Sequence, residues 1–307
     1  MNVLIVSGFL GAGKTTFIKH LAATSGLSFA VLENEYGEVG VDGDDLRQQQ
    51  LEVLELAEGC ICCTRSGNFT SSLLALLGSL NPQWLVVEPS GVGLLGTIMN
   101  NLAPLAKTGI YALAPVTLVD GAAWALGLQD YGPYYEDQIR NAGTLVVTKT
   151  EDLPEAKRAE LIEWLKTLNP QAELVDDDYR LRDPSWARSL FHKQATGESR
   201  PSVTLGLARP LQVTFTGLGI DVAGDCVELL EAMLDGQFGR IARAKGFAPF
   251  EEGQWGHFDL ASGRWGLEPC APMEPSRLIV IGQDLDVEGL QKAWKAQSYQ
   301  EQDESHF

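Results

Sequence analysis

The amino-acid sequence predicts an α/β fold in which a mostly parallel sheet is flanked by helices and followed by a small α+β domain. Short apolar runs alternate with segments of helical spacing through the N-terminal part of the 307 residues. Such alternation is typical of parallel sheets with helices on both faces. The pattern changes near the polar segment 196–201, which we interpret as a linker. We therefore predict one domain over residues 1–195 and a second over residues 196–307.

In the first domain, polar segments follow the apolar runs that we predict to be strands. Helices are predicted at 16–21, around 73–77, and at 155–168, where Asn169 and Pro170 end the helix. Ligands of parallel sheets bind beyond the carboxyl ends of the strands, which is where these polar segments fall. The predicted strands cover residues 3–7, 29–32, 51–56, 84–87, 116–119 and 145–147.

The second domain is predicted to be small, with its own core. A strand at 211–215 and a helix at 222–234 precede a glycine- and tryptophan-rich set of short runs. A strand at 278–281 and a final helix at 287–294 follow. The polar residues 298–307 are expected to fray.

Charge and cysteine content exclude several classes of partner. The net charge of −18 disfavours nucleic acid and anionic membranes. No run approaches the ~18 apolar residues that a membrane-spanning helix needs. The number of cysteines is odd, five, and three of them crowd at Cys60, Cys62 and Cys63, which does not resemble a disulfide framework. A reducing, cytoplasmic location is therefore expected.

The segment 8–15 carries the strongest motif of the chain. It matches Gly-x-x-x-x-Gly-Lys-Ser/Thr between an apolar strand and a predicted helix, the context that a phosphate-binding loop (P-loop) requires. Lys14 would reach the β- and γ-phosphates, and Thr15 would offer its hydroxyl to Mg²⁺. The sequence thus predicts a P-loop NTPase fold and a site for a nucleoside triphosphate. The predicted phosphate-binding residues are Gly8, Gly11, Ala12, Gly13, Lys14, Thr15 and Thr16.

The cysteine cluster is the second informative motif. Thiolates in one short loop are soft ligands suited to Zn²⁺ or Cu⁺, and an iron–sulfur cluster is an alternative. Three sulfurs leave one tetrahedral position for Glu33, Glu35, Glu38 or water. Two other interpretations stay open: three small residues packed at a strand end, and a redox pair, which the spacing does not favour.

Three motifs, in this order and spacing, resemble the CobW family. They are the P-loop 8–15, the acidic segment 33–42 and the segment 59–63 with Cys60, Cys62 and Cys63. The resemblance extends to the segment 86–91, and in the C-terminal part to 243–246 and 276–282. Members of this family are P-loop GTPases regarded as metal chaperones or metal-insertion factors, related to the nickel-insertion GTPases of urease and hydrogenase.

The resemblance implies roles for further residues. Glu88 would take the place of a Walker-B-type carboxylate beside the Mg²⁺ held by Thr15, and Gly91 would close the same motif. Glu38 and Asp42 would lie on a switch that senses the γ-phosphate and Mg²⁺. The implied catalytic residues are Lys14, Thr15, Glu38 and Glu88, and the implied metal ligands are Cys60, Cys62, Cys63 and Glu33.

The chain departs from the family pattern at the segment that would read the base. GTPases of this type read guanine with Asn/Thr-Lys-x-Asp, whereas this chain has Thr148, Lys149, Thr150 and Glu151. Glu151 offers the same acceptor oxygens on a side chain that is one methylene longer, and the alternative is that the following Asp152 turns in instead. We expect GTP to be preferred over ATP.

Together the motifs predict a GTP-binding, slowly GTP-hydrolysing metallochaperone that captures Zn²⁺ or Co²⁺ at the cysteines. The metal would be delivered to a client metalloprotein or a cofactor pathway, and cobalamin synthesis is an association of the family. The alternatives are a P-loop kinase or ATPase with structural cysteines, and a non-catalytic scaffold that binds nucleotide and metal. A homo-oligomer is compatible with all three.

Overall fold

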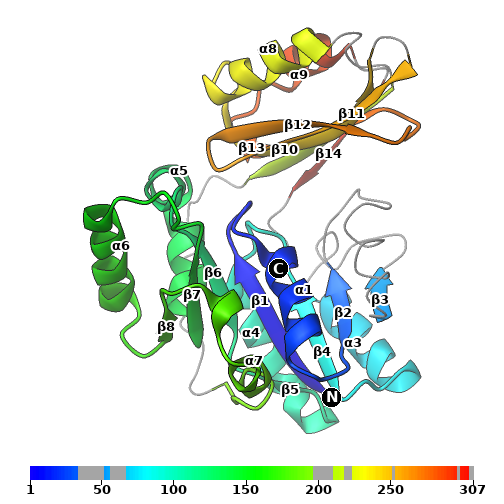
Figure 1. The fold of residues 1–307 in the computed structure, drawn as a ribbon. Coiled ribbons are helices and arrows are strands. Elements are labelled where there is room, and N and C mark those ends of the chain that lie inside the picture. The colour runs from blue at the N-terminus through cyan, green and yellow to red at the C-terminus, as the bar shows by residue number, and fades with distance from the viewer. Residues whose placement is uncertain are drawn as a thin grey trace. The chain divides into compact units, whose positions relative to one another are not determined.

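The computed structural model describes residues 1–33, 52–55, 67–195, 210–217, 223–250, 253–295 and 298–303. The chain divides into two compact units, residues 1–205 and 206–304 (Figure 1). The boundary predicted at residue 196 falls in a segment outside the described residues and stays a prediction.

The first unit alternates strands and helices along the chain. Its elements are β1 (Asn2–Gly8), α1 (Lys14–Thr24), β2 (Ala30–Glu33), β3 (Glu52–Glu55), α3 (Gly67–Ser79), β4 (Trp84–Glu88), α4 (Leu95–Leu102), the 3₁₀ helix η1 (Ala103–Thr108), β5 (Tyr111–Ala112), β6 (Val116–Asp120), α5 (Trp124–Arg140), β7 (Thr144–Thr148), α6 (Glu155–Leu168), β8 (Glu173–Val175), the 3₁₀ helix η2 (Tyr179–Leu181) and α7 (Pro184–Ser189).

These strands form one eight-stranded sheet in the order β3-β2-β4-β1-β6-β7-β8, with β5 paired to β1. Every pair of named strands in this sheet is parallel. The predicted parallel α/β fold is therefore confirmed. Because β4 and β6 flank β1 on opposite sides, the strand order reverses at β1, and the P-loop starts at its carboxyl end.

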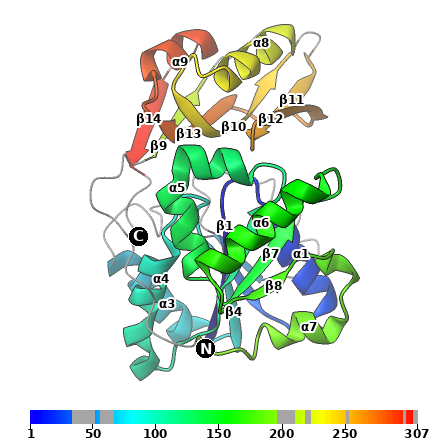
Figure 2. The ribbon, with the colours of Figure 1, turned by 90° about the vertical axis from the view of Figure 1, so that its left-hand side faces the viewer.

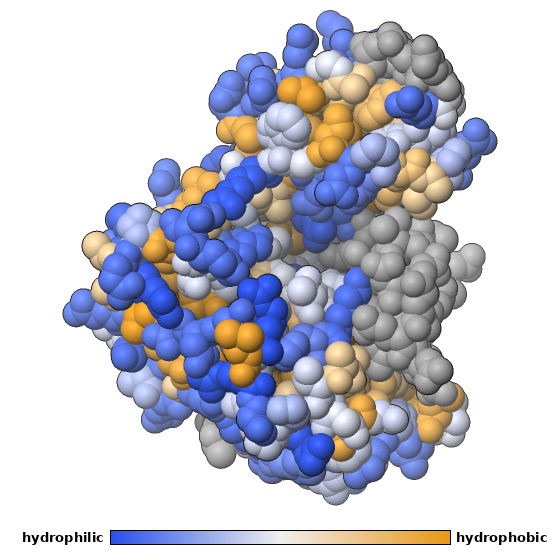
Figure 3. All heavy atoms as spheres, viewed as in Figure 1, coloured by the Kyte–Doolittle hydropathy of each residue, from blue (hydrophilic) through white to orange (hydrophobic). Residues whose placement is uncertain are grey.

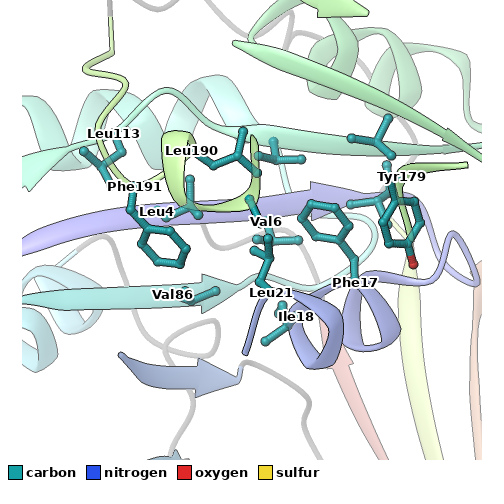
Figure 4. Packing of buried hydrophobic residues seen from close by; sticks show 14 of the residues in the cluster. Leu4, Val6, Phe17, Ile18, Leu21, Val86, Leu113, Tyr179, Leu190 and Phe191 are labelled. Carbon is teal, nitrogen blue, oxygen red and sulfur yellow. The ribbon is translucent and has the colours of Figure 1, made fainter. Parts of the chain in front are cut away.

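Helices cover both faces of this sheet and bury an apolar core on each. On one face, Phe17, Ile18 and Leu21 of α1 pack with Leu190 and Phe191 at the end of α7 against the strands (Figure 4). On the other face, α3 and α4 pack against the same strands through residues such as Phe69, Leu73, Ile98 and Leu102. The apolar runs of the parallel strands are thus buried from both sides, as their composition predicts.

Helix α5 was not singled out by the sequence. It contains Gly127, Gly132 and Pro133, and the backbone at Tyr131 departs from helical geometry at φ −129° and ψ 27°. Glycine and proline inside a helical pattern conceal it, because both disfavour a regular helix. The helix lies beside α6 on one side of the sheet (Figure 2).

The second unit is an antiparallel sheet with two helices. Its six strands are ordered β12-β11-β10-β13-β9-β14. Helices α8 and α9 lie on the same face of this sheet in both views (Figures 1 and 2), where Leu230 and Trp294 join the core. The elements are β9 (Leu211–Thr216), α8 (Ala223–Leu234), β10 (Arg240–Pro249), β11 (Trp255–Ala261), β12 (Arg264–Cys270), β13 (Arg277–Gln283), α9 (Val287–Trp294) and β14 (Ser298–Asp303).

One expectation for this unit was wrong. Residues 298–303 do not fray: they form β14, which pairs antiparallel with β9 from Ser298 opposite Thr216 onward. Backbone hydrogen bonds to an edge strand do not depend on apolar side chains, so the polar composition was misleading. The glycine- and tryptophan-rich runs form a meander of long strands, β10 to β12, in which Ser262 and Gly263 make a two-residue turn with positive φ at both residues.

Among the described residues, none of the helices has the length and apolar character needed to cross a membrane. Most described residues on the face shown in Figure 3 are hydrophilic, and apolar residues appear there in separate small groups.

Candidate nucleotide and metal site

The P-loop leaves β1 through backbone conformations that require glycine. Gly8 has a φ of 145°, and a Cβ at this position would lie 2.7 Å from the carbonyl oxygen of Leu118 on β6. Gly13 has a φ of 93° and immediately precedes α1. These two glycines let the chain turn sharply from the strand into the helix, so that the N-terminus of α1 faces the loop. Thr16, in the first turn of α1, is exposed.

Lys14 is buried at the start of α1 and is held between the loop and β4. Its side chain is 5% exposed, and its Nζ donates a hydrogen bond of 3.2 Å to the carbonyl oxygen of Gly8. The same Nζ lies 3.9 Å from Oε1 of Glu88, whose side chain is 3% exposed. A buried lysine with a buried carboxylate beside it forms a charge pair at the carboxyl end of the sheet.

Thr15 joins the P-loop to the same carboxylate. Its hydroxyl donates to the Glu88 carboxylate, with Oγ1 at 3.1 Å from Oε2 and 3.2 Å from Oε1. Glu88 is the last residue of β4, and the strand register places Glu33 of β2 beside it. The structure therefore brings together Lys14, Thr15 and Glu88, three of the predicted catalytic residues.

Gly91 lies against the P-loop from the side of β4. A Cβ at Gly91 would be 2.7 Å from the backbone nitrogen of Leu10, so only a glycine permits this approach. The turn that contains it is closed by a hydrogen bond of 2.9 Å from the Gly93 N–H to the Ser90 carbonyl. The segment after Glu88 and the P-loop thus pack backbone against backbone.

The segment predicted to read the base supports the P-loop from the other side. The Thr148 hydroxyl donates to the carbonyl oxygen of Ala12 at 3.0 Å, and Lys149 Nζ donates to that of Gly11 at 2.6 Å. Lys149 Nζ also forms a 2.9 Å ion pair with Asp120 Oδ2, and the other oxygen of Asp120 accepts from the N–H groups of Ala122 and Ala123. Asp120 ends β6; the sequence marks it only as the polar residue after the predicted strand 116–119 and assigns it no role of its own.

Glu151 is exposed and paired. Its Oε1 lies 3.2 Å from Arg180 Nη2, and Arg180 also binds Asp178. The hydrogen bond from Arg180 lowers the pKa of Asp178. Tyr179 lies between Asp178 and Arg180 in the chain, and its ring packs edge-on against the ring of His20 on α1. Burial lowers the pKa of His20. The residues from η2 therefore connect the base-reading segment to the helix that follows the P-loop.

Several predicted site residues lie outside the described part of the chain. They are Glu38, Asp42, Cys60, Cys62, Cys63 and the side chain of Glu33. Within the described residues, no group of three or more His, Cys, Asp or Glu side chains is arranged to hold a metal ion. Cys226 and Cys270 are described: burial raises the pKa of the Cys226 thiol to about 12 and also raises that of Cys270.

A second residue that the sequence did not single out is Gln138 of α5. It is 2% exposed and donates hydrogen bonds to the carbonyl oxygens of Gly91 and Gly93. Its only sequence signal is a polar residue between the buried positions of a helix, and the irregular pattern of α5 hides that signal.

Comparison with known families identifies the larger unit. The family model of the CobW/HypB/UreG nucleotide-binding domain matches residues 2–176. The chain belongs to the CobW/HypB/UreG family. The model of the C-terminal domain of the cobalamin synthesis protein cobW matches residues 225–297, within the second unit. The resemblance inferred from the motifs is thereby confirmed.

Individual members of the CobW/HypB/UreG family align with part of the chain. The zinc chaperone YjiA of Escherichia coli is 34% identical over 177 residues, which cover 55% of each chain. The zinc chaperone CobW of Pseudomonas aeruginosa is 36% identical over 154 residues, covering 46% of this chain and 40% of the relative. The chain spans about half the length of the curated relatives it matches.

A crystal structure of Zn(II)-bound YjiA GTPase from E. coli superimposes with a TM-score of 0.48 and 21% identity, covering 95% of this chain and 97% of that one.

Proposed function

We propose that this protein is a GTP-dependent metallochaperone. It binds GTP with Mg²⁺, hydrolyses the nucleotide slowly, and captures Zn²⁺ or Co²⁺ at Cys60, Cys62 and Cys63 for delivery to a client metalloprotein or cofactor pathway. Membership of the CobW/HypB/UreG family supports the nucleotide site, and the similarity to zinc chaperones supports the metal cargo. The cytoplasm is the proposed location.

The observation that carries the nucleotide site is the convergence of Lys14, Thr15 and Glu88 at the end of the P-loop. Lys14 Nζ stabilises the negative charge of the β- and γ-phosphates, and it exchanges its bond to the Gly8 carbonyl for one to the nucleotide. The N–H groups of the P-loop and of the first turn of α1 bind the phosphate oxygens. The Gly91 N–H meets the terminal phosphate from the side of β4.

The residues present fit Mg²⁺. A hydroxyl and a carboxylate within 3.2 Å of each other are hard oxygen donors of the kind that Mg²⁺ binds together with phosphates. We assign the ion to Thr15 Oγ1 and the Glu88 carboxylate. Bound there, it would neutralise charge that develops on the phosphates during hydrolysis. The hydrogen bond between Thr15 and Glu88 already holds these two oxygen donors side by side. The burial of Glu88 excludes water that would compete with the ion for its carboxylate.

The base site is assigned to Thr148, Lys149 and Glu151. Thr148 and Lys149 bind the P-loop carbonyls of Ala12 and Gly11 and so attach this segment to the P-loop. Glu151 follows three residues after the end of β7. The Glu151 carboxylate would accept the N1 and N2 hydrogens of guanine, which adenine cannot supply in the same arrangement.

Topology supports placing the metal cargo near the nucleotide. The strands that precede the acidic and the cysteine segments, β2 and β3, are parallel neighbours, and Glu33 pairs in register with Glu55 and with Glu88. Both segments therefore start from the edge of the sheet where Glu88 lies. Cys226 and Cys270 are poor alternatives, because burial raises the pKa of both thiols and so opposes formation of the thiolate that a metal ion binds. Glu38 and Asp42, in the acidic segment, would couple the γ-phosphate to the metal site.

The decisive experiment compares the metal content of three proteins purified without a metal-affinity step: the wild type, Cys62→Ala and Cys270→Ala. We expect stoichiometric Zn²⁺ or Co²⁺ in the wild type and in Cys270→Ala, and its loss in Cys62→Ala. Cys270→Ala is the matched control, since it also removes one thiol. Metal that persists in Cys62→Ala would contradict the proposed site.

Titration of the same metal with and without a non-hydrolysable GTP analogue tests the coupling. Linkage requires that each ligand change the affinity of the other by the same factor, so identical metal affinities would refute it. GTP hydrolysis should disappear in Lys14→Ala. Hydrolysis unaffected by Cys62→Ala together with phosphorylation of a small acceptor would favour a kinase instead.

A further inference from the structure

The segment that follows Glu88 is held by a buried amide from α5. Gln138 Nε2 donates to the carbonyl oxygen of Gly91 at 2.9 Å and to that of Gly93 at 3.0 Å. The backbone carbonyl of Gln138 accepts a 3.0 Å hydrogen bond from the Thr117 hydroxyl, which anchors α5 to β6. One buried side chain therefore satisfies two carbonyls of a single turn.

The opposite side of this turn contacts the P-loop. Gly91 approaches Leu10 so closely that a Cβ would lie 2.7 Å from the Leu10 backbone nitrogen. Within the turn, Ser90 O accepts from Gly93 N at 2.9 Å. Because a peptide group is planar, this bond also fixes the direction of the Gly91 N–H, and the Gln138 bond to Gly91 O fixes that of the Val92 N–H.

The next point of attachment also comes from α5. Asp137 Oδ2, buried, accepts from the Gly96 N–H at 3.1 Å, near the start of α4. Two successive residues of α5 thus hold the segment 91–96 while its other side rests on the P-loop. Removal of the Gln138 amide would release the part nearest the P-loop and leave the Asp137 attachment in place.

We propose that Gln138 is a positioning residue that lets the protein distinguish a nucleoside triphosphate from a diphosphate. Gln138 holds the turn 90–93 so that the backbone N–H groups of the turn meet the terminal phosphate, which a diphosphate lacks. This inference rests on the proposed nucleotide site and adds the residue that sets its selectivity. Gln138 acts through the Gly91 turn and does not itself touch the nucleotide.

The test measures the affinities of a non-hydrolysable GTP analogue and of GDP, both with Mg²⁺, in the full-length wild type, Gln138→Met and Thr117→Val. Methionine keeps the length of the side chain and removes both donors. We expect Gln138→Met to bind the triphosphate on the order of tenfold more weakly, because two carbonyls lose their donor, and to bind GDP within about twofold of the wild type.

Thr117→Val is the matched control, because it removes a buried hydrogen bond to the same residue and leaves the amide in place. Its ratio of triphosphate to diphosphate affinity should stay at the wild-type value. An unchanged ratio in Gln138→Met, an equal loss of both nucleotides, or the same ratio change in Thr117→Val would overturn the inference while leaving the nucleotide site intact. A wild type that binds neither nucleotide would overturn the proposed function and the inference together.

A second measurement does not depend on the folding of a variant. Hydrogen exchange of the wild-type amides 91–96 should slow with the triphosphate analogue and not with GDP. Equal protection by both nucleotides would overturn the inference.

Discussion

Glu151 illustrates how a single residue changes the reading of a motif. Guanine-reading sequences of this type end in aspartate, and this chain has a longer carboxylate that pairs with Arg180 at 3.2 Å. Arg180 is itself held by Asp178, and this hydrogen bond raises the pKa of the Arg180 guanidinium, which is in any case charged at every physiological pH. The ion pair is exposed and contributes little to stability. Its consequence is geometric, since it restricts where the longer side chain can lie.

We expect Glu151→Ala to remove the preference for guanine. GTP affinity should fall by about tenfold or more, because a bidentate contact to a base carries roughly 1–3 kcal/mol of discrimination, while ATP affinity should not change. Competition of GTP and ATP against a fluorescent nucleotide measures both.

Glu155→Ala provides the control, because this carboxylate lies at the start of α6, close to Glu151 in sequence. If ATP and GTP displace the fluorescent nucleotide from the wild-type protein equally well, the assignment of the base site is contradicted.

At the scale of elements, α5 links the candidate site to the fold. Near its end, Asp137 and Gln138 hold the segment after Glu88. Beyond its end, Asn169 pairs with two buried backbone carbonyls: its Nδ2 donates to the carbonyl oxygens of Ile139 at 2.8 Å and Ala142 at 2.9 Å. From the sequence, Asn169 was predicted only to end the helix 155–168. In the structure it also caps the neighbouring helix, which satisfies carbonyls that a helix end leaves without partners.

We expect Asn169→Ala to destabilise the first unit by about 1–3 kcal/mol, the cost of leaving buried acceptors unpaired. Urea unfolding followed by circular dichroism measures the change. Asn2→Ala is a suitable control because its bond to the Gln83 carbonyl is exposed and 3.4 Å long. Equal stability of Asn169→Ala and the wild type would show that water replaces the lost donor.

At the scale of the whole molecule, the two units differ in architecture. The first encloses apolar cores on two faces of a parallel sheet, and the second has its own core between an antiparallel sheet and two helices. Each therefore has what an independently folding domain requires. All described residues of the candidate site belong to the first unit.

Calorimetry should accordingly resolve two unfolding transitions. GTP with Mg²⁺ should raise the midpoint temperature of only one of them. At a ligand concentration a hundredfold above the dissociation constant, the expected rise is about 5–10 °C for a domain of this size. The Lys14→Ala variant should show no such rise. A single transition that moves as a whole would contradict this expectation and the independence of the two units.

The motifs that the sequence revealed are local in the chain. The P-loop, the strand ending in Glu88 and the segment 148–151 each carry a recognisable order of residues, because phosphate binding demands particular residue types at fixed spacing. Asp120, Gln138 and Arg180 could not be found in the same way. Each acts on a residue distant in the chain, and an isolated aspartate, glutamine or arginine carries no spacing signal.

The order of amino acids by itself determined the parallel α/β fold, the family and the identity of the phosphate-binding residues, because hydrophobic period and glycine placement are properties of consecutive residues. Only the tertiary structure decided that residues 298–303 form an edge strand and that a buried amide on α5 holds the turn beside the P-loop. Both depend on hydrogen bonds between segments distant in sequence, and such bonds exist only after the chain has packed its cores.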